Sequence, residues 1–130
     1  MPTTVKDLMA AANTAVPRIT PDTAREMIAR GALVIDVRDG AEVEKTGKIA
    51  GAVHVTRGML EFRADPGTPY FEPAFRFDRP VIVYCASGGR AALAGKTLKD
   101  MGYAEVFNLG GLKDWIDAKG AVDTPLDPGM

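Results

Sequence analysis

The strongest constraint in the sequence is an abrupt change of pattern at Cys85, the only cysteine in the chain. Residues 81–84 form an uncharged run of β-branched and aromatic residues, which is typical of a strand buried on both faces. From Arg90 to Met101 apolar residues recur at three- and four-residue spacing, which predicts a helix that Gly102 ends. Cys85 is therefore predicted to lie where a buried strand meets a short loop that leads into a helix.

The loop after Cys85 has the composition of an anion-binding loop. Gly88 and Gly89 permit unusual backbone angles and close approach, so successive amide N–H groups can converge on one point. The positive end of the following helix and the guanidinium of Arg90 add positive charge, and such surroundings stabilise a thiolate. The alternative is that Cys85 is a small buried hydrophobe. Such a site does not require Ser87, two glycines and an arginine in the next five positions, so we favour a reactive thiolate.

Composition indicates an ordinary globular protein and excludes several classes of function. The 130 residues are enough for one domain with a real core, and 46% hydrophobic with 25% charged residues are usual values. A net charge of −1 without a long basic run predicts no nucleic-acid partner. No apolar run approaches the roughly 20 residues that span a bilayer. Residues 1–15 also lack the features of a secretory signal, so we expect no membrane association and a cytoplasmic location.

A single cysteine limits the chemistry further. It cannot form an intrachain disulfide or supply a multi-cysteine metal site, so we expect no metal and no cofactor. Any sulfur or redox chemistry at Cys85 needs a partner molecule from outside the chain.

Strand and helix patterns divide the chain into three parts. Apolar residues at positions 5, 8, 9 and 12 predict a short helix in an N-terminal arm, residues 1–19. The main domain, residues 20–120, starts with Thr20-Pro21-Asp22, a hydroxyl cap followed by proline and an acid in the first helical turn. Residues 121–130, rich in Asp, Pro and Gly, predict a flexible C-terminal tail. The N-terminal helix is either a leading arm or an oligomer contact.

Within the main domain, short apolar strands alternate with helices. The predicted strands are residues 33–37, 53–55, 81–84 and 105–109. This alternation predicts an α/β fold with a mostly parallel central sheet flanked by helices on both faces. Ligands of such sheets collect beyond the carboxyl ends of the strands. Cys85 lies at such an end, and Asp36 and Arg38 lie near another.

Charged residues cluster around the end of the strand predicted at residues 33–37. Arg38 and Glu42 are four residues apart, so they can form an ion pair if residues 39–45 form a turn of helix. We favour this structural role for the cluster over a catalytic one. Asp36 lies inside an apolar strand, where its carboxylate must find a hydrogen-bond donor.

Two other features leave alternatives open. His54, the only histidine, lies between two valines, and the absence of a nearby orienting partner favours a hydrogen-bonded structural role over a general base. Residues 56–79 are irregular, aromatic and basic, with a short helix predicted around Leu60 and turns at the prolines. This segment either walls one side of an active site or covers the sheet edge as an aromatic flap.

Three motifs, in order and suitably spaced, match those of one known family. Asp36-Val37-Arg38 with Glu42, followed by GKIAGAVHV at residues 47–55, resembles the family's amino-terminal signature. CASGGRA at residues 85–91 is similar to its six-residue active-site loop. The carboxyl-terminal signature resembles Gly102-Tyr103 through Val106, Leu109-Gly110-Gly111 and Trp115. Over residues 20–119 the chain thus resembles a single-domain rhodanese.

The resemblance implies a three-layer rhodanese-like fold and sulfurtransferase chemistry. In that chemistry a cysteine thiolate takes the outer sulfur of a donor such as thiosulfate, becomes a persulfide, and passes the sulfur to cyanide or a thiol. Carried onto this sequence, Cys85 is the nucleophile, and Arg90 closes the loop and can meet an anionic donor. The amides that would hold the terminal sulfur are those of Ala86, Ser87, Gly88, Gly89 and Arg90. Asp36, Arg38 and Glu42 are supporting residues.

The implied partners are a small-molecule sulfur donor, a thiol acceptor and, alternatively, a protein that accepts sulfur.

The chain departs from the family pattern at Lys48 and Ala50, where members often have His and Pro. Both residues lie in a predicted turn, so we expect an effect on local rigidity and not on the chemistry. The loop after Cys85 also differs from the loop of the tandem-domain thiosulfate and mercaptopyruvate enzymes, so the resemblance does not identify the sulfur donor.

Four other functions are alternatives to this interpretation. Cysteine-dependent phosphatases on a related fold have five residues between Cys and Arg, usually after a His, whereas here four intervene and Tyr84 precedes the cysteine. The shorter loop suits one sulfur atom better than phosphate; arsenate reduction is a further alternative. A phosphate-binding loop at Gly89 and residues 95–97 fails because the glycines have the wrong spacing. A persulfide-carrying relay or regulatory module uses the same loop as a free-standing enzyme, so the sequence does not separate the two.

Overall fold

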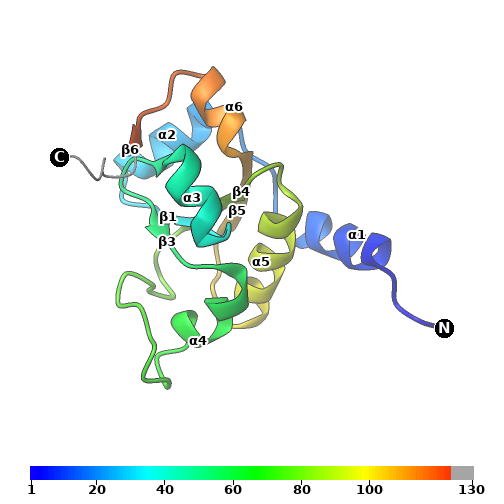
Figure 1. The fold of residues 1–130 in the computed structure, drawn as a ribbon. Coiled ribbons are helices and arrows are strands. Elements are labelled where there is room, and N and C mark those ends of the chain that lie inside the picture. The colour runs from blue at the N-terminus through cyan, green and yellow to red at the C-terminus, as the bar shows by residue number, and fades with distance from the viewer. Residues whose placement is uncertain (124–130) are drawn as a thin grey trace.

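The computed structural model describes residues 1–123 (Figure 1). The elements in chain order are α1 (Val5–Ala15), α2 (Pro21–Ala29), β1 (Leu33–Asp36), α3 (Gly40–Thr46), β2 (Lys48–Ile49), β3 (Val53–His54), the 3-10 helix η1 (Arg57–Met59), α4 (Leu60–Ala64), β4 (Val81–Cys85), α5 (Gly89–Asp100), β5 (Val106–Gly111), α6 (Leu112–Asp117) and β6 (Val122–Asp123). The predicted start of α2 is confirmed, because the Thr20 side chain accepts a hydrogen bond from the Thr23 amide.

A four-stranded sheet in the order β3-β1-β4-β5 forms the centre of the fold, and all its neighbouring strands are parallel. Asp36 at the end of β1 is in register with His54 on β3 and with Tyr84 on β4. The carboxyl ends of these strands therefore meet at one edge of the sheet. The predicted α/β class with a mostly parallel sheet is confirmed.

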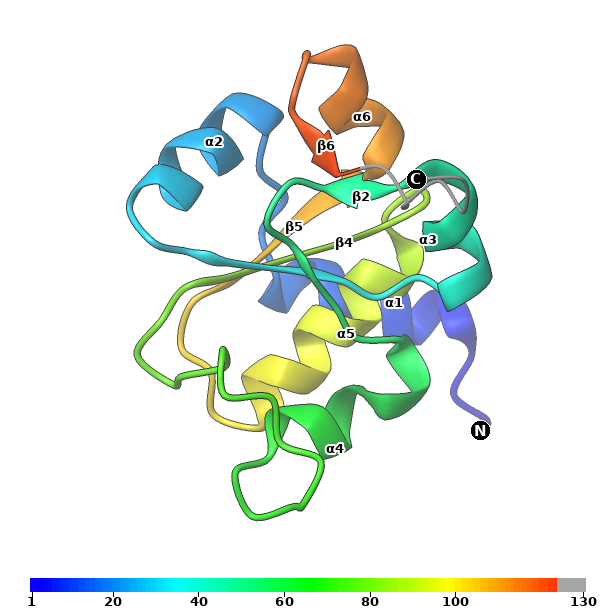
Figure 2. The same ribbon diagram turned by 60° about the vertical axis from the view of Figure 1, so that its left-hand side comes forward.

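Helices cover both faces of the sheet, as predicted (Figure 2). Two apolar cores separate the layers, one between the sheet and α4 and α5, the other between the sheet and α2 and α6. The side chains of β4 alternate between them: Val83 and Cys85 lie in the first core, and Ile82 and Tyr84 lie in the second. This alternation directs Cys85 towards the face that α5 covers.

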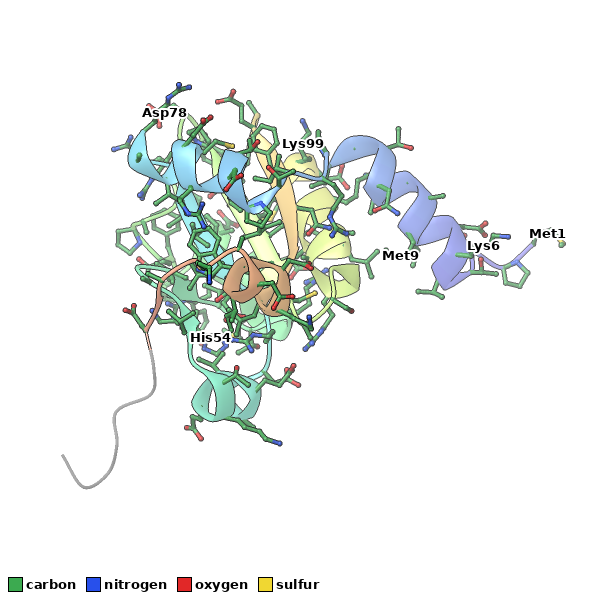
Figure 3. All side chains as sticks on the ribbon, turned by 90° about the horizontal axis from the view of Figure 1, so that it is seen from above. Met1, Lys6, Met9, His54, Asp78 and Lys99 are labelled. Atoms are coloured by element: carbon green, nitrogen blue, oxygen red, sulfur yellow. The ribbon has the colours of Figure 1, made fainter. Side chains whose placement is uncertain are left out.

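The N-terminal arm is joined to the sheet. The predicted helix exists as α1, which packs against α5 and buries Ala12, while its first turns extend away from the body of the protein (Figures 1 and 3). After α1, residues 17–19 run beside β5: the Asn108 amide donates to the Pro17 carbonyl, and the Ile19 amide donates to the Asn108 carbonyl. An oligomer contact through α1 stays a prediction.

The predicted flexible tail at residues 121–130 begins with a short strand. Val122 and Asp123 form β6, which pairs antiparallel with β2, so the expectation was wrong at these two positions. The Asp123 carboxylate accepts hydrogen bonds from Lys48 Nζ and the Gly51 amide, and these bonds hold β6 in place. Residues 124–130 lie outside the described residues. The division of the chain after residues 19 and 120 stays a prediction.

The segment at residues 56–79 contains the predicted short helix as α4, which directly follows the 3-10 helix η1, and residues 65–79 form no helix or strand. Two of its aromatic rings pack on Tyr103, which follows α5: Phe75 at 5.5 Å and Phe77 at 4.6 Å between ring centroids. The Tyr103 hydroxyl donates to the Ala64 carbonyl. These contacts favour the aromatic flap over an active-site wall. In the described part of the chain, none of the helices has the length and apolar character needed to cross a membrane.

Candidate active site

Cys85 is the last residue of β4, and its sulfur is enclosed by the loop that follows. The side chain is 1% exposed. Its Sγ accepts hydrogen bonds from the Gly88 amide at 3.0 Å and from the Ala91 amide at 3.4 Å. Both donors belong to the turn that starts α5, so the sulfur lies at the positive end of a twelve-residue helix. The thiol is therefore directed at backbone donors, an arrangement that stabilises negative charge on sulfur.

The backbone conformation favours glycine at position 88. Its φ is +111°, in the left-handed region that residues with a side chain rarely adopt. This conformation turns the chain into α5, where the Ala91 amide also donates to the sulfur.

Asn108 on β5 holds the loop from the other side. Its side-chain nitrogen donates to the Gly88 carbonyl at 3.1 Å, and its Oδ1 accepts from the Gly110 amide at 2.8 Å. The side chain is buried, so these bonds are shielded from water. The sequence analysis missed this residue. The available signal was an amide side chain within an otherwise apolar strand, the same signal that singled out Asp36.

Glu42 pairs with Arg90, and the expected Arg38–Glu42 ion pair does not form. The two oxygens of Glu42 accept from Nη1 and Nη2 of Arg90 at 2.7 and 3.0 Å, a bidentate geometry. The helix predicted at residues 39–45 does form, as α3, but it turns Glu42 towards the Cys85 loop and away from Arg38. The bonds to Arg90 lower the pKa of Glu42 to about 2, and those to Glu42 raise the pKa of Arg90.

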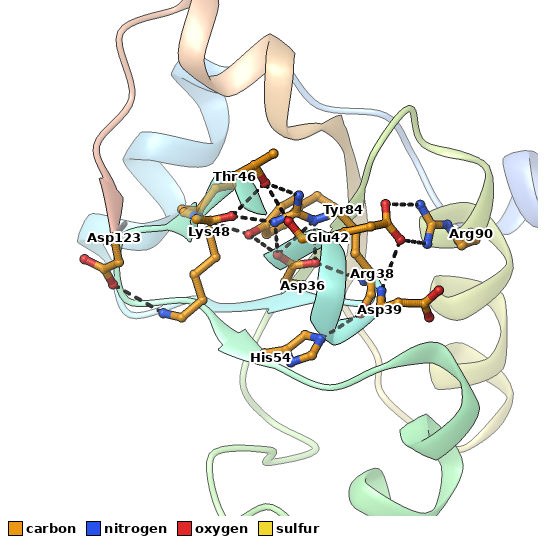
Figure 4. A network of polar contacts seen from close by, with 12 residues as sticks. Asp36, Arg38, Asp39, Glu42, Thr46, Lys48, His54, Tyr84, Arg90 and Asp123 are labelled. Carbon is orange, nitrogen blue, oxygen red and sulfur yellow. Dashed lines mark hydrogen bonds and ion pairs between the residues drawn. The ribbon is translucent and has the colours of Figure 1, made fainter. Parts of the chain in front are cut away.

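Arg38 belongs instead to a buried network around Asp36 (Figure 4). Asp36 and Arg38 are 0% and 3% exposed, and Arg38 Nη2 lies 2.7 Å from Asp36 Oδ2. The Tyr84 hydroxyl donates to the same oxygen at 2.6 Å and accepts from the Ile49 amide at 2.9 Å. Arg38 also donates hydrogen bonds to Thr46 Oγ1 and to the Gly47 carbonyl. Burial and the hydrogen bond to Asp36 raise the pKa of Tyr84.

This network confirms that Asp36 has hydrogen-bond donors, as an acid inside an apolar strand requires. His54 is also hydrogen-bonded, through Nε2 to the Arg38 carbonyl at 2.6 Å, which agrees with the structural role expected of it. Within residues 1–123, no three His, Cys, Asp or Glu side chains are grouped so as to hold a metal ion.

The family model for the rhodanese-like domain matches residues 20–118. The chain belongs to this family. Among curated relatives, the thiosulfate sulfurtransferase GlpE of Haemophilus influenzae is 33% identical over 108 residues, which span 82% of this chain and 93% of the relative.

Three solved structures share the fold of this chain. A protein of unknown function from Rhodopseudomonas palustris, described as a possible tyrosine phosphatase, has a TM-score of 0.83 at 40% identity, covering 95% of this chain and 99% of that one. The polysulfide-sulfur transferase homodimer of Wolinella succinogenes has a TM-score of 0.73 at 28% identity, covering 96% and 90%. Human TSTD1, a single-domain sulfurtransferase, is 22% identical with a TM-score of 0.69, covering 78% and 96%, and it supports the fold alone.

In this rhodanese-like chain the predicted site residues separate into two groups. Cys85, Gly88, Arg90 and Glu42 come together around the loop, and Ala91 joins them although it was not predicted. Asp36 and Arg38 form the buried network next to them. The predicted contacts of the five loop amides, residues 86–90, with the outer sulfur of a persulfide stay a prediction.

Proposed function

We propose that this protein is a sulfurtransferase that carries sulfur as a persulfide on Cys85. Membership of the rhodanese-like family and relatives that are named sulfurtransferases support the reaction class. The observation that carries the proposal is the pair of hydrogen bonds from the Gly88 and Ala91 amides to Cys85 Sγ at the start of α5. Backbone donors fixed in this way stabilise an anionic sulfur without reorganisation during the reaction.

The first step loads the cysteine. The Cys85 thiolate attacks the outer sulfur of thiosulfate, the Sγ–S bond forms, and the S–S bond of thiosulfate breaks with its electron pair leaving on sulfite. The charge is the same before and after, because one thiolate and a dianion become one persulfide anion and a dianion. Arg90 is placed to attract the anionic donor, and Glu42 fixes the direction of its guanidinium.

The second step removes the sulfur from Cys85. An acceptor thiolate or cyanide attacks the outer sulfur of the persulfide, the Sγ–S bond breaks, and Cys85 leaves as a thiolate ready for another cycle. Loop amides at residues 86–90 would hold the outer sulfur between the two steps, as the family resemblance implies.

Intact-mass measurement after incubation with thiosulfate tests the proposal. We expect a gain of one sulfur atom per chain, and none in Cys85→Ser, whose circular dichroism spectrum verifies that it folds. Addition of cyanide or glutathione then removes the sulfur within seconds to minutes and yields thiocyanate or a glutathione persulfide.

Two other outcomes would assign the protein differently. Release of sulfur only to a protein thiol, with none to small acceptors, would make the protein a persulfide relay. Hydrolysis of an aryl phosphate that depends on Cys85, with no sulfur gain from thiosulfate, would support the phosphatase and overturn the proposal.

A further inference from the structure

A pocket of about 340 Å³ opens beside the Cys85 loop, between α3 and α6. Its size lies within the range of small-molecule sites. Ala86, the residue directly after Cys85, lines the pocket and is exposed, so the pocket and the active-site loop share a wall that solvent reaches. A molecule bound there lies against the residue that directly follows Cys85 in the chain.

The floor and side walls of this pocket are largely apolar. Leu112 is 5% exposed and forms part of the apolar core under α6, whereas Ile116, one turn further along the helix, is 47% exposed. A large aliphatic side chain that is half exposed in a concave site is available to cover the methylene groups of a ligand. The surface therefore suits a hydrocarbon chain better than a sugar or a phosphate.

The rim of the pocket carries positive charge. Of the charged residues that line it, Arg38 is paired with Asp36, Glu42 with Arg90, and Lys113 with Asp117. Lys45 also lines the pocket, and within residues 1–123 it forms no ion pair. The Lys113–Asp117 pair is open to solvent, which makes it weak. Among the described residues, one lysine at the mouth of this apolar pocket therefore has no carboxylate paired with it.

We propose that this pocket binds the acceptor of the sulfur, and that the acceptors are small aliphatic thiols ending in a carboxylate. The methylene chain lies against Leu112 and Ile116, the carboxylate meets Lys45 at the rim, and the thiol end reaches the loop at Ala86. This inference rests on the proposed sulfurtransferase function and names its substrate class.

The transfer step balances without any further reagent. The acceptor thiolate attacks the outer sulfur of the Cys85 persulfide, a new S–S bond forms on the acceptor, and the Sγ–S bond breaks with its electron pair on Sγ. One persulfide and one thiolate become one thiolate and one persulfide, so no oxidant or reductant is consumed.

A series of ω-mercapto carboxylates tests the inference on the thiosulfate-loaded protein. Chains of four, six and eight carbons are compared, because the basicity of the thiol is nearly constant in this range. We expect the second-order rate constant for sulfur loss, measured by quenched intact mass, to rise about threefold per added methylene. A carboxylate should react about threefold faster than the corresponding amide of equal length.

Variants connect these effects to the pocket. Ile116→Ser should reduce the gain per methylene to below about 1.5-fold, and Lys45→Gln should remove the preference for carboxylate over amide. Val5→Ser and Lys6→Gln, matched changes on exposed positions of α1, should leave both dependences as in the parent chain. All of these positions are exposed, so loss of folding does not confuse the result.

Failure of the inference differs from failure of the proposed function. If no sulfur is loaded from thiosulfate, the proposed function is wrong. If sulfur is loaded, and its release does not depend on the chain length or the head group of the acceptor, the protein is a sulfurtransferase and the pocket is not its acceptor site. A chain-length effect that survives Ile116→Ser would likewise overturn the assignment to this pocket.

Discussion

Two charged clusters arise from the same short stretch of chain, residues 36–42, and they differ in almost every respect. In the first, Asp36 and Arg38 are buried and bonded to Tyr84. In the second, Glu42 and Arg90 form a bidentate pair in which each side chain is about a third exposed, at 35% and 37%. The first connects β1, β4 and the turn before β2, whereas the second connects α3 to the loop that holds the sulfur.

The two clusters differ in burial, and we expect the buried one to determine folding and the partly exposed one to affect sulfur loading. A buried charge that loses its partner is costly because water cannot replace the partner, so the Asp36 network must stay intact for the chain to fold. A partly exposed pair contributes less to stability, and in the proposed mechanism Arg90 acts on an anion that approaches the loop. Changes to each cluster should therefore have separate effects on folding and on sulfur loading.

The largest expected effect follows from Asp36→Ala. It leaves the Arg38 guanidinium buried without its carboxylate, and we expect the free energy of unfolding to fall by about 3–5 kcal/mol in urea denaturation followed by circular dichroism. The double variant Asp36→Leu with Arg38→Met removes both charges and should recover most of this loss. A fall below about 1 kcal/mol in the single variant would show that water enters the network.

Tyr84→Phe should have the next largest effect on stability. It removes one hydroxyl that both donates to Asp36 and accepts from the Ile49 amide, and we expect a loss of about 1–3 kcal/mol. Tyr70→Phe is the matched control, because Tyr70 is exposed; its loss should stay under about 0.5 kcal/mol. Equal losses in the two variants would contradict the role given to the buried hydroxyl.

Arg90→Gln should separate stability from chemistry. Loss of the partly exposed pair with Glu42 should lower the free energy of unfolding by less than about 1 kcal/mol. Loss of the positive charge beside the anion should slow sulfur loading from thiosulfate about tenfold, which corresponds to ~1.4 kcal/mol in the barrier. Rates come from the intact mass at timed quenches. Loading at the parent rate would remove Arg90 from the proposed mechanism.

The smallest effect is a pH dependence. Pairing with Arg90 lowers the pKa of Glu42 from its ordinary value of 4.5 to about 2. The stability that this carboxylate contributes is therefore fully present above about pH 4.5 and is lost as the pH falls towards 2. The difference in stability between the parent chain and Glu42→Gln should be constant from pH 7 to 5 and shrink below that. A change centred near pH 6 would point to another group.

Local patterns in the sequence predicted most of the fold. The apolar run at residues 81–84 and the Thr20 cap each depend on neighbouring residues, so β4 and the start of α2 appear where expected. The loop glycines likewise indicated that Cys85 meets backbone amides. These features follow from backbone conformation and burial, which a few adjacent residues decide.

Contacts between segments that are distant in the sequence were harder to predict. Arg38 and Glu42 have the spacing of a helical ion pair, but the end of β1 turns Arg38 inward and α3 turns Glu42 outward, so each finds a partner elsewhere. The support that Asn108 gives to Gly88 depends on the register of β5 against β4. The pairing of β6 with β2 joins residues more than seventy positions apart. No pattern along the chain encodes these contacts directly.

The bonds between residues 17–19 and Asn108 have a consequence for how the chain behaves in concentrated solution. β5 is an outer strand of the parallel sheet, and its backbone groups on that side are a template onto which a strand of another molecule can add. The residues before the rhodanese-like region occupy part of that template. Shortening the chain to begin at residue 20 should therefore promote self-association into aggregates, even though every residue of the loop after Cys85 is kept.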